Sequence, residues 1–465
     1  MNAGERLLKE RGIDPNAKEP APPRPPPNVP PLGVYDESSG RFWTSSPAGR
    51  WTSMGETQFS RLLRASGLNK NGYCTNGLTE VEHALLQLQQ HESVQWAGDL
   101  AGWPSGLHTI SGQRVLVVTG PSLVKPKRGP WKTLRWFFES LLGDEVFHLF
   151  NWLHCALQAM AAGYPWREGQ AFAIAGPARS GKSLTQRLIT KLLGGRSAKP
   201  FRYLAGETAF NRDLFGAEHL MLEDDASELS RAARRKMSAN LKTLVANELH
   251  SLHAKGRDAL TLPPFWRVSF SLNDEPDYLG VLPYMDASIK DKIFLLRASK
   301  VPMPFTDGDL QARHKFGAAL DAELPAFAAY LRSYRVPAEW QDPSFGCRSF
   351  HDPLLLSKLA DLEDEFIFLE LIDRHLWVER AAEPWEGSAS ELESVLRTAV
   401  GNAEINRICP YNTACGVQLG KLAAKTPNRV QRLPGRGHKS HWRIYHPANP
   451  GSVDAAEGVG NTKEG

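Results

Sequence analysis

The stretch Phe172-Ala-Ile-Ala-Gly-Pro-Ala-Arg-Ser-Gly-Lys-Ser183 decides the fold of this chain. Its first four residues are small or apolar and predict a buried strand, and a segment with helical periodicity, Leu184 to Leu193, follows at once. Between them, Gly176 to Ser183 has the spacing G-x-x-x-x-G-K-S. Strand, glycine-bounded loop and helix therefore come in order, which predicts an α/β domain built on a parallel sheet.

This loop has the composition of a phosphate-binding loop. A loop without bulky side chains can turn its backbone N–H groups towards a phosphate, and the N-terminus of the next helix adds partial positive charge. We expect Lys182 to reach the β- and γ-phosphates of ATP and Ser183 to bind Mg²⁺. A glycine-rich turn that matches by chance is the alternative. The expected nucleotide-binding residues are Gly176, Pro177, Ala178, Arg179, Ser180, Gly181, Lys182, Ser183 and Leu184.

Length and composition set the class of protein. With 465 residues, of which 42% are hydrophobic, the chain can bury two or three cores. No apolar run approaches the roughly 20 residues that a membrane span needs, and residues 1–16 are charged and unlike a signal peptide. We therefore expect a cytoplasmic protein without a membrane partner. The net charge of +4 is too small to indicate a partner by itself.

The cysteines do not form a recognisable metal or disulfide pattern. No two of the five are spaced as C-x-x-C, which argues against a zinc site and against a disulfide framework. Reduced thiols with a structural role are expected at Cys74, Cys155, Cys347, Cys409 and Cys415.

Changes in composition divide the chain into six parts. The first is rich in proline and lacks the apolar residues needed to fold, so we expect it to be disordered and extended. The predicted parts are a leader (1–33), a mixed α/β domain (34–165), an ATPase core (166–345), a helical connector (346–384), a winged-helix-like domain (385–446) and a disordered tail (447–465).

Four elements are predicted in the N-terminal domain. Val34 to Trp43 has the pattern of a hairpin around a Ser-Ser-Gly turn, and Gln113 to Thr119 has that of a short strand. Large apolar residues recur with helical spacing over Trp131 to Leu142 and over Glu145 to Met160. This domain has no paired acidic motif and no Cys/His cluster of the kind that would indicate a primase or a nuclease. We therefore expect a structural or oligomerisation role.

A second apolar strand, Glu218-His-Leu-Met-Leu-Glu-Asp-Asp225, ends in three carboxylates. Acids at the carboxyl end of a parallel strand beside a phosphate loop can hold a nucleotide-bound Mg²⁺ and orient an attacking water. We expect Glu223 in the Mg²⁺ shell and Asp224 as the base, with Asp224 also near the metal and Asp225 as the competitor for the base. The alternative is an acid-rich helix N-terminus, since the residues from Ala226 look helical.

Two further features follow along the chain. Glu248 to Leu262 is predicted to form two short strands about the turn Ala254-Lys-Gly-Arg257, whose tip carries His253, Lys255 and Arg257. These cations could contact a phosphodiester backbone, although an ordinary solvated turn is an equal alternative. Phe265 to Asp274 is another apolar strand, and Asn273 at its end could hold the attacking water or sense the γ-phosphate.

The order of these four motifs resembles that of the superfamily 3 helicases, especially the phage- and plasmid-type primase-helicases. The resemblance extends over about Pro165 to Phe305, and more loosely over Val34 to Gly163. It implies an AAA-type P-loop NTPase core, a ring of subunits, commonly a hexamer, with ATP at the interfaces, and movement along single-stranded or forked DNA together with other replication proteins. In this pattern Asn273 matches the sensor strand, and Lys255 with Arg257 matches the DNA-gripping hairpin.

One position departs from the pattern of these helicases. Many relatives carry an arginine finger where this chain has Ser288-Ile-Lys-Asp-Lys-Ile293. Lys290 or Lys292 could substitute, although a lysine cannot make the bidentate contact of an arginine. Arg297, in an apolar strand-like run, is a further candidate.

The C-terminal region is predicted to be helical and then basic. We expect a long amphipathic helix from Leu354 to about Val378, a helix opened by a capping box at Ser388, and a helix over Val417 to Lys425. Two strands then flank the Pro434-Gly-Arg-Gly turn. Residues 407–446 hold eight Lys and Arg and no acid, which favours nucleic-acid contact over a solvated face, through Arg436, Lys439 and Arg443.

Three functions are compatible with the sequence. The leading one is an ATP-dependent DNA helicase or replication ATPase of phage or mobile-element type. The second is a DNA-binding initiator or defence-type switch that uses ATP to assemble without unwinding. The third is a small-molecule P-loop kinase, which the polar sensor strand and the basic C-terminus disfavour.

Overall fold

The computed structural model describes residues 33–74, 76–161, 168–223, 231–255, 259–283, 285, 288–306, 308–360, 364–378, 383–436 and 439–451. The predicted leader lies outside these ranges apart from Gly33, and the predicted tail lies outside them apart from residues 447–451. None of the helices in the described ranges combines the length and the apolar character needed to cross a bilayer.

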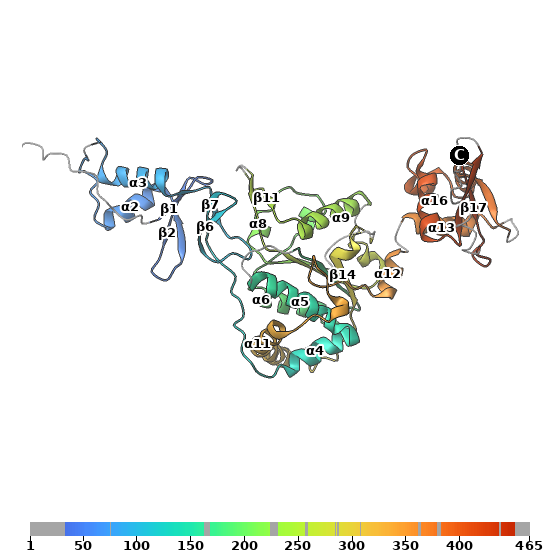
Figure 1. The fold of residues 1–465 in the computed structure, drawn as a ribbon, viewed down its shortest axis with the longest axis horizontal. Coiled ribbons are helices and arrows are strands. Elements are labelled where there is room, and N and C mark those ends of the chain that lie inside the picture. Colours follow the sequence, from blue (N-terminus) through green and yellow to red (C-terminus); the bar gives the residue numbers. More distant parts are fainter. Residues whose placement is uncertain are drawn as a thin grey trace, which may run out of the picture.

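The N-terminal part begins with a small sheet covered by two helices (Figure 1). The predicted hairpin is confirmed, because Val34 pairs with Trp43 and Asp36 pairs with Arg41. Phe42 on the sheet and Phe59 on the first helix are buried and stack with ring centroids 4.9 Å apart. The elements are β1 (Val34–Asp36), β2 (Arg41–Ser45), β3 (Trp51–Met54), α2 (Glu56–Ala65), α3 (Glu80–His91) and β4 (Ser93–Val94), with strand order β3-β2-β1-β4.

A three-stranded sheet joins this part to the centre of the molecule. Its strands are β5 (Trp96–Gly98), β6 (Gly106–Ile110) and β7 (Gln113–Val117), with β7 in the middle, and β7 confirms the strand predicted there. Trp96 and Val115 belong to the buried cluster of the central sheet. At the junction, the guanidinium of Arg196 pairs with the buried carboxylate of Glu218, which also accepts a hydrogen bond from the backbone N–H of Gly102 at 2.8 Å.

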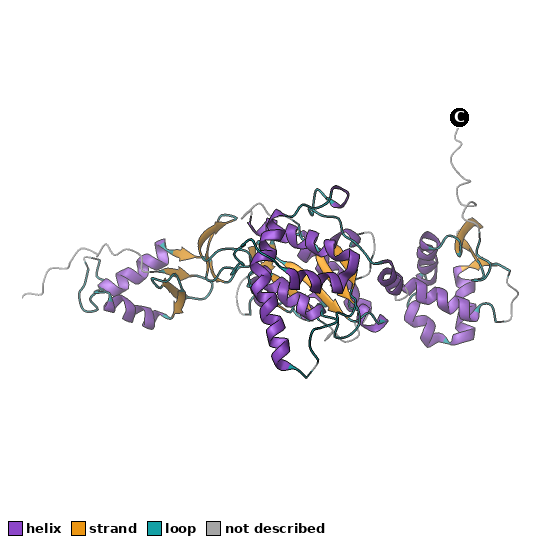
Figure 2. Cartoon of the chain, turned by 90° about the horizontal axis from the view of Figure 1, so that it is seen from below, coloured by secondary structure: helices purple, strands orange, loops and turns teal. Residues whose placement is uncertain are grey.

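The central sheet has five strands, and all neighbouring strands are parallel (Figure 2). Ala175, the last residue of β8, pairs with the last residue of each neighbour, Leu272 of β13 and Arg297 of β14. The three strands therefore end at one edge, as the parallel sheet predicted from the loop requires. In spatial order the strands are β14 (Ile293–Arg297), β8 (Ala171–Ala175), β13 (Arg267–Leu272), β10 (His219–Leu222) and β9 (Ser197–Ala198).

Helices cover one face of this sheet. Phe172 and Ile174 of β8 point into an apolar cluster with these helices, which confirm the helices predicted before and after the loop. The covering helices are α4 (Lys132–Leu142), α5 (Val146–Ala161), α6 (Lys182–Leu192) and α11 (Leu310–Ser333), and short 3-10 helices lie at η1 (Gly143–Glu145), η2 (Lys290–Lys292) and η3 (Ala338–Trp340).

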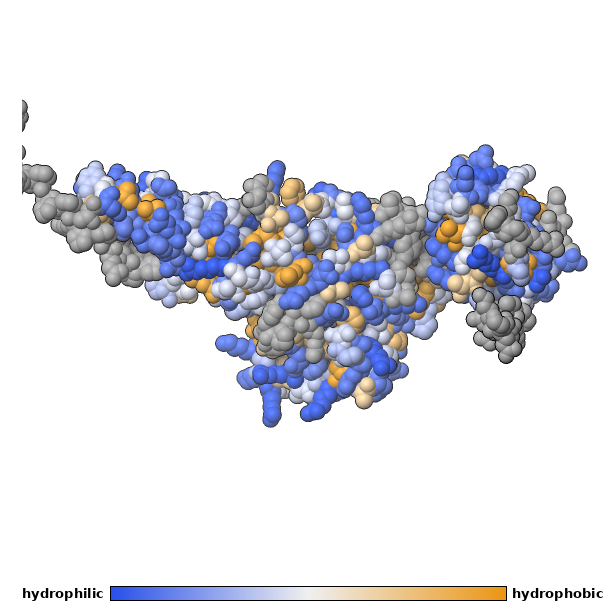
Figure 3. All heavy atoms as spheres, turned by 45° about the horizontal axis from the view of Figure 1, so that its top comes forward, coloured by the Kyte–Doolittle hydropathy of each residue, from blue (hydrophilic) through white to orange (hydrophobic). Residues whose placement is uncertain are grey.

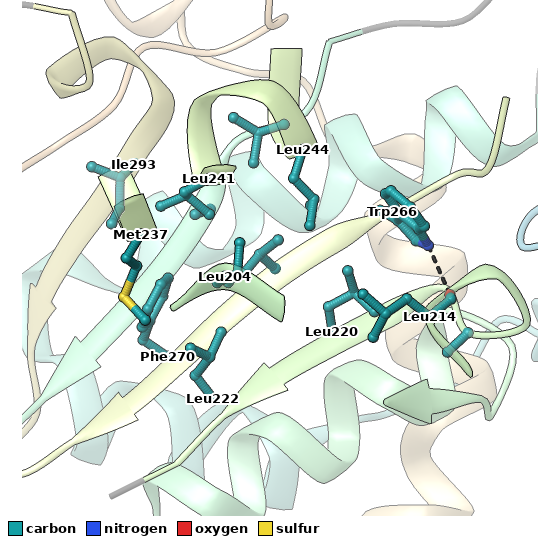
Figure 4. Packing of buried hydrophobic residues seen from close by; sticks show 14 of the residues in the cluster. Leu204, Leu214, Leu220, Leu222, Met237, Leu241, Leu244, Trp266, Phe270 and Ile293 are labelled. Carbon is teal, nitrogen blue, oxygen red and sulfur yellow. Dashed lines mark hydrogen bonds between the residues drawn. The ribbon is translucent and has the colours of Figure 1, made fainter. Parts of the chain in front are cut away.

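The opposite face packs against five further helices and the β5-β7-β6 sheet. Figure 4 shows Leu220 and Phe270 of the sheet beneath Met237 and Leu241 of α9. Trp266 closes this cluster and donates its indole N–H to the carbonyl of Leu214 at 2.9 Å. The helices on this face are α7 (Phe201–Leu204), α8 (Arg212–Phe215), α9 (Arg231–Ala246), α10 (Pro276–Leu279) and α12 (Pro353–Ala360).

The predicted hairpin after α9 is confirmed as β11 (His250–Leu252) and β12 (Leu260–Leu262), which pair antiparallel. Asn211, at the start of α8, fastens the base of the hairpin. Its side-chain amide donates to the carbonyl of Ser251 at 2.9 Å and accepts from the backbone N–H of His253 at 2.8 Å. The turn residues 256–258 lie outside the described part of the chain.

The C-terminal elements share a separate apolar cluster. Ser388 begins a helix with the predicted capping box, since its hydroxyl accepts from the backbone N–H of Glu391 and Glu391 accepts from the backbone N–H of Ser388. The sheet order is β15-β17-β16. The elements are α13 (Asp364–His375), β15 (Trp385–Ser388), α14 (Ala389–Val400), α15 (Asn402–Ile408), α16 (Ala414–Lys425), β16 (Val430–Arg436) and β17 (Lys439–Ile444).

The long helix predicted from Leu354 to Val378 is described as two helices, α12 and α13. Leu355 of α12 packs on the central sheet, whereas Phe368 of α13 packs with the C-terminal elements. The predicted connector, 346–384, is thus shared between two cores. Apolar periodicity shows which face of a helix is buried but does not show which core buries it, so the sequence could not reveal this division.

Candidate nucleotide-binding site

The loop between β8 and α6 has a backbone shape that its glycines permit. Gly181 has φ +113° and begins α6, and Arg179 also has a positive φ, of 59°, which is rare for a residue other than glycine. A side chain at Gly176 would place Cβ 2.3 Å from the carbonyl oxygen of Ala298 at the end of β14. Glycine at these two ends of the loop is therefore required by conformation and by close approach.

Lys182 and Asn273, predicted from separate motifs, lie side by side. The Lys182 ammonium donates to the carbonyl oxygens of Gly176 and Pro177, each at 2.8 Å, and to Oδ1 of Asn273 at 3.2 Å. Lys182 is only 5% exposed. Parallel strands bring this about, because β13 and β8 end at the same edge of the sheet. Ser183, the second residue of α6, is exposed.

A pocket of about 970 Å³ opens beside the loop. Backbone and side chains of Ala178 to Leu184 line one side, and the first half of α11 lines the other. This second side holds aromatic and charged groups. The rings of Phe305 and Phe316 are 5.7 Å apart between centroids, and Arg313 lies over the Phe305 ring at 5.6 Å. Asp321 also lines the pocket and pairs with Lys191 at 2.6 Å. A pocket of this volume has room for a nucleotide.

Sequence reasoning missed this second side of the pocket. The residues concerned follow β14 in the chain and share no motif, so their place opposite the loop depends on how α11 packs. The one available signal is Gly317, a helix-interior glycine, which is unfavourable in a helix unless space is needed. The missed lining residues on this side are Met303, Phe305, Arg313, His314, Phe316, Gly317, Ala318, Leu320 and Asp321.

A buried polar network fastens α6 to the strands beside it. His219 of β10 is fully buried between the hydroxyls of Thr190 at 2.7 Å and Ser269 at 2.8 Å. Gln186 of α6 donates to the hydroxyl of Ser269 at 2.8 Å and to the carbonyl of Leu222 at 3.1 Å. Burial lowers the pKa of His219 from 6.5 to about 3, so the imidazole is neutral at pH 7. The network holds the loop helix in register with the strand that precedes Glu223.

The acidic motif is described only in part. Glu223 directly follows β10, and its carboxylate pairs with Lys199 at 2.6 Å. Asp224 and Asp225 lie outside the described residues, so their predicted roles stay predictions. Among the described residues no group of three or more His, Cys, Asp or Glu side chains could hold a metal. Glu223 and Ser183 are suitable Mg²⁺ ligands by chemistry, since Mg²⁺ keeps several waters and needs few protein oxygens.

The candidates for the arginine-finger role lie at opposite ends of strand β14. Lys290 and Lys292 precede β14 and lie at the edge opposite the loop, with Lys292 paired to Asp291 at 2.9 Å. Both therefore lie at the end of β14 away from the loop. Arg297 ends β14, level with Ala175 at the loop edge, and pairs with Asp352 at 3.4 Å.

The hairpin cations are exposed where the structure describes them. His253 and Lys255 are both solvent-exposed beyond the base that Asn211 fixes, and Arg257 lies outside the described residues. Phe210, next to Asn211, is 54% exposed and is an aromatic side chain that sequence reasoning did not single out.

The basic C-terminal run is less one-sided in space than in sequence. Lys421 and Lys425 pair with the buried carboxylate of Glu365 at 3.1 and 2.8 Å, and Arg443 pairs with Glu386 at 2.6 Å. Arg429 likewise pairs with Asp373. Among the side chains that the structure describes, these four cations thus meet acids from α13 and β15, which precede the basic run in the chain. Of the predicted DNA contacts, Arg436 and Lys439 are opposite each other in the backbone register of β16 and β17. Their side chains lie outside the described part.

The comparisons with known proteins bear on the fold. Residues 174–283 match DUF5906, a family of unknown function. No curated protein matches the chain. The apo structure of the NrS-1 C-terminal region aligns over 89% of this chain and 95% of that one, with a TM-score of 0.54 and 12% identity. The chain shares its fold with the NrS-1 C-terminal region.

A second NrS-1 structure, the A form of the apo C-terminal region, gives the same result. It aligns over 89% of this chain and 96% of that one, with a TM-score of 0.51 and 13% identity. The likeness to NrS-1 therefore extends over nearly the full length of both chains, including the parts before and after the central sheet.

Proposed function

We propose that this protein is an ATP-hydrolysing motor that moves along single-stranded DNA, as the superfamily 3 helicases do. The observation that carries the proposal is the meeting of Lys182 and Asn273 beside a nucleotide-sized pocket. A lysine at a helix N-terminus, facing a polar side chain from the adjacent strand, is the arrangement that positions and senses a γ-phosphate.

Each residue has a role in this proposal. Lys182 neutralises phosphate charge that develops in the transition state, and Ser183 with Glu223 would hold Mg²⁺. Asp224 or Asp225 orients the attacking water. Asn273 exchanges its bond to Lys182 for one to phosphate or water, which links the nucleotide state to β13. When bound, Mg²⁺ supplies charge neutralisation between the phosphates.

The remaining parts of the chain fit a ring-forming motor. Lys290 or Lys292 would act on the nucleotide of a neighbouring subunit, because both lie at the far edge of their own sheet. The exposed hairpin, with His253 and Lys255, would contact the strand in the central channel of a hexamer. The C-terminal elements, arranged as helices followed by a β-ribbon, would form a winged helix that contacts forked DNA through Arg436 and Lys439.

The test compares Lys182→Ala with Lys70→Ala, a surface lysine of the N-terminal part. We expect Lys182→Ala to reduce ATP hydrolysis by at least about 10²–10³-fold while the thermal unfolding profile is retained, because it removes a charge that stabilises the transition state. Lys70→Ala should hydrolyse ATP like the parent protein. Parental turnover in Lys182→Ala would disprove the site.

A second measurement distinguishes the motor from the other two functions. Single-stranded DNA should stimulate ATP hydrolysis, and the protein should separate the strands of a forked duplex only with ATP. Stimulation without strand separation would indicate the ATP-dependent switch. Absence of any DNA effect, with phosphate transfer to a small molecule, would indicate the kinase.

A further inference from the structure

The segment that links the β5-β7-β6 sheet to α4 is strongly basic. Residues 121–132, which end at the first residue of α4, carry four Lys and Arg residues and no acidic residue. Until α4 begins, the segment has no helix or strand, yet two backbone hydrogen bonds hold it. Ser122 N–H donates to Gly194 O at 3.0 Å, and Lys127 N–H donates to Pro325 O at 2.9 Å. The path of these cations over the surface is therefore set by the fold.

A groove of about 620 Å³ lies between this segment and the second half of α11. Arg128 and Trp131 line it from the segment, and Tyr330 and Arg332 line it from α11. The rings of Trp131 and Tyr330 are 4.7 Å apart between centroids. Two guanidinium groups and an aromatic pair thus share one concave surface, which we call the Arg128 groove.

The cations around the Arg128 groove are exposed and have no acidic partners. Lys125, Lys127, Arg128, Lys132 and Arg332 are all solvent-exposed, and none of the five forms an ion pair with any other described residue. This differs from the C-terminal run, where carboxylates of α13 and β15 pair with Lys421, Lys425, Arg429 and Arg443. In Figure 3 the lower end of the molecule, where Figure 1 places α4 and α11, carries projecting hydrophilic side chains.

We propose that the Arg128 groove binds single-stranded nucleic acid. Sites of this kind combine cations that follow the phosphate backbone with aromatic side chains on which bases stack, and both are present here. An unpaired run of exposed cations gives a strongly favourable counterion-release contribution, which paired cations do not give. The aromatic pair favours a strand with unstacked bases over a duplex, whose bases are covered.

The Arg128 groove is separate from the β11–β12 hairpin and from the nucleotide pocket. The same helix lines both cavities, however. Arg313 and Phe316 of α11 line the nucleotide pocket, and Tyr330 and Arg332, further along α11, line the groove. The proposal concerns binding without nucleotide, so it stands or fails independently of ATP hydrolysis.

The test uses the full chain without nucleotide and a fluorescent 20-nucleotide oligothymidylate. The double variant Arg128→Ala/Arg332→Ala removes two groove cations. Arg61→Ala/Arg64→Ala, at the exposed surface of α2, removes the same charge elsewhere. Anisotropy titrations at several KCl concentrations should show about tenfold weaker binding for the groove variant at 0.1 M salt, and a salt slope reduced by about 1.4 for two lost contacts. Equal affinity and slope for the two variants would overturn the proposal.

A second measurement locates the bases. An oligonucleotide with 5-iodouracil should crosslink to peptides that contain Trp131 or Tyr330, and Tyr330→Leu should weaken binding by about fivefold or more through lost stacking. Because Tyr330 packs among other rings, the thermal unfolding of this variant is measured alongside. If it unfolds, the crosslinks and the arginine variants decide. Crosslinks confined to the hairpin or to the C-terminal elements would also overturn the proposal.

Discussion

The phosphate-loop region and the basic C-terminal region are both distinctive in sequence, but they differ in how well the sequence predicts the surroundings of their side chains. In the first, Lys182 and Asn273 come from motifs 91 residues apart and meet within hydrogen-bond distance. In the second, the run holds eight cations and no acid in sequence, yet Lys421, Lys425, Arg429 and Arg443 pair with carboxylates from elsewhere in the chain.

The difference arises from what each pattern encodes. A strand, a loop and a helix in order carry their own geometry, and parallel strands bring their carboxyl ends together. A charge run encodes only composition, because the surrounding field depends on elements elsewhere in the chain. Here α13, which precedes the run by some forty residues, contributes the decisive acids Glu365 and Asp373.

The largest expected effect concerns the contact that defines the loop region. We expect Asn273→Ala to lower the kcat of ATP hydrolysis by about 10²-fold, because one preorganised polar group at the phosphates is lost. Asn406→Ala is the matched control in the C-terminal region, where Oδ1 of Asn406 accepts from Arg397 at 2.8 Å. Steady-state ATPase assays check both variants. If both variants turned over ATP at the parental rate, the meeting of Lys182 and Asn273 would be structural only.

A pH effect is expected next, through the network under α6. The unfolded chain protonates His219 as the pH falls below about 6.5, whereas the folded chain keeps the imidazole neutral down to about 3. The unfolded state therefore binds more protons in this window, and stability falls with falling pH by about 1.4 kcal/mol per pH unit, or about 2 kcal/mol at pH 5. The stability that depends on neutral, buried His219 is fully present above pH 6.5.

Urea unfolding of the full chain at pH 7.5, 6 and 5 measures this slope. His219→Gln removes the titrating group and should flatten the slope, and His91→Gln makes the same chemical change on the exposed surface of α3. An unchanged slope in His219→Gln would show that other groups cause the acid sensitivity. His148, whose pKa burial lowers to about 4, would be the first to examine.

The fold was largely predictable from the sequence, whereas only the loop side of the pocket was predictable at the site. The alternation of apolar segments and glycine-bounded turns indicated β1, β2, β7, β8, the hairpin and the C-terminal ribbon, because these patterns are local. The aromatic side of the pocket, with Phe305 and Phe316, could not be predicted, since it depends on how α11 packs across about 130 residues of chain. The division of the predicted long helix between two cores could not be predicted either, because it too depends on which parts of the chain pack together.

The paired cations of the C-terminal region can be released by removing their acidic partner. Burial alone would raise the pKa of Glu365, but hydrogen bonds from Lys425 and Lys421 outweigh it, and the pKa lies below its ordinary value. Glu365→Gln keeps a hydrogen-bond acceptor and removes the charge, so the two half-exposed lysines become available to phosphates. We expect about threefold to tenfold tighter binding of single-stranded DNA at low salt, with a steeper salt slope.

Anisotropy titrations compare this variant with Glu370→Gln, which removes an exposed acid of the same helix that pairs with Arg374 at 2.6 Å. The control should change affinity by less than about twofold, because an exposed pair contributes little. If Glu365→Gln bound DNA no better than Glu370→Gln, the C-terminal cations would not face nucleic acid, and the basic run would be a structural feature of α13 and α16.

The smallest expected effect compares one glycine from each region. Gly317 lies inside α11, where an added Cβ would meet nothing within 4 Å, because the glycine borders the nucleotide pocket. Gly401 also has open space around it, but its φ is +87°. Compared with glycine, alanine stabilises a helix interior and is strained at a positive φ. Gly317→Ala should therefore raise the free energy of unfolding by about 0.5–1 kcal/mol, and Gly401→Ala should lower it by a similar amount. Thermal unfolding measures both signs. Since neither Cβ makes a contact, only backbone conformation can account for opposite shifts, and two shifts of the same sign would mean that α11 or the Gly401 turn has a different backbone in solution.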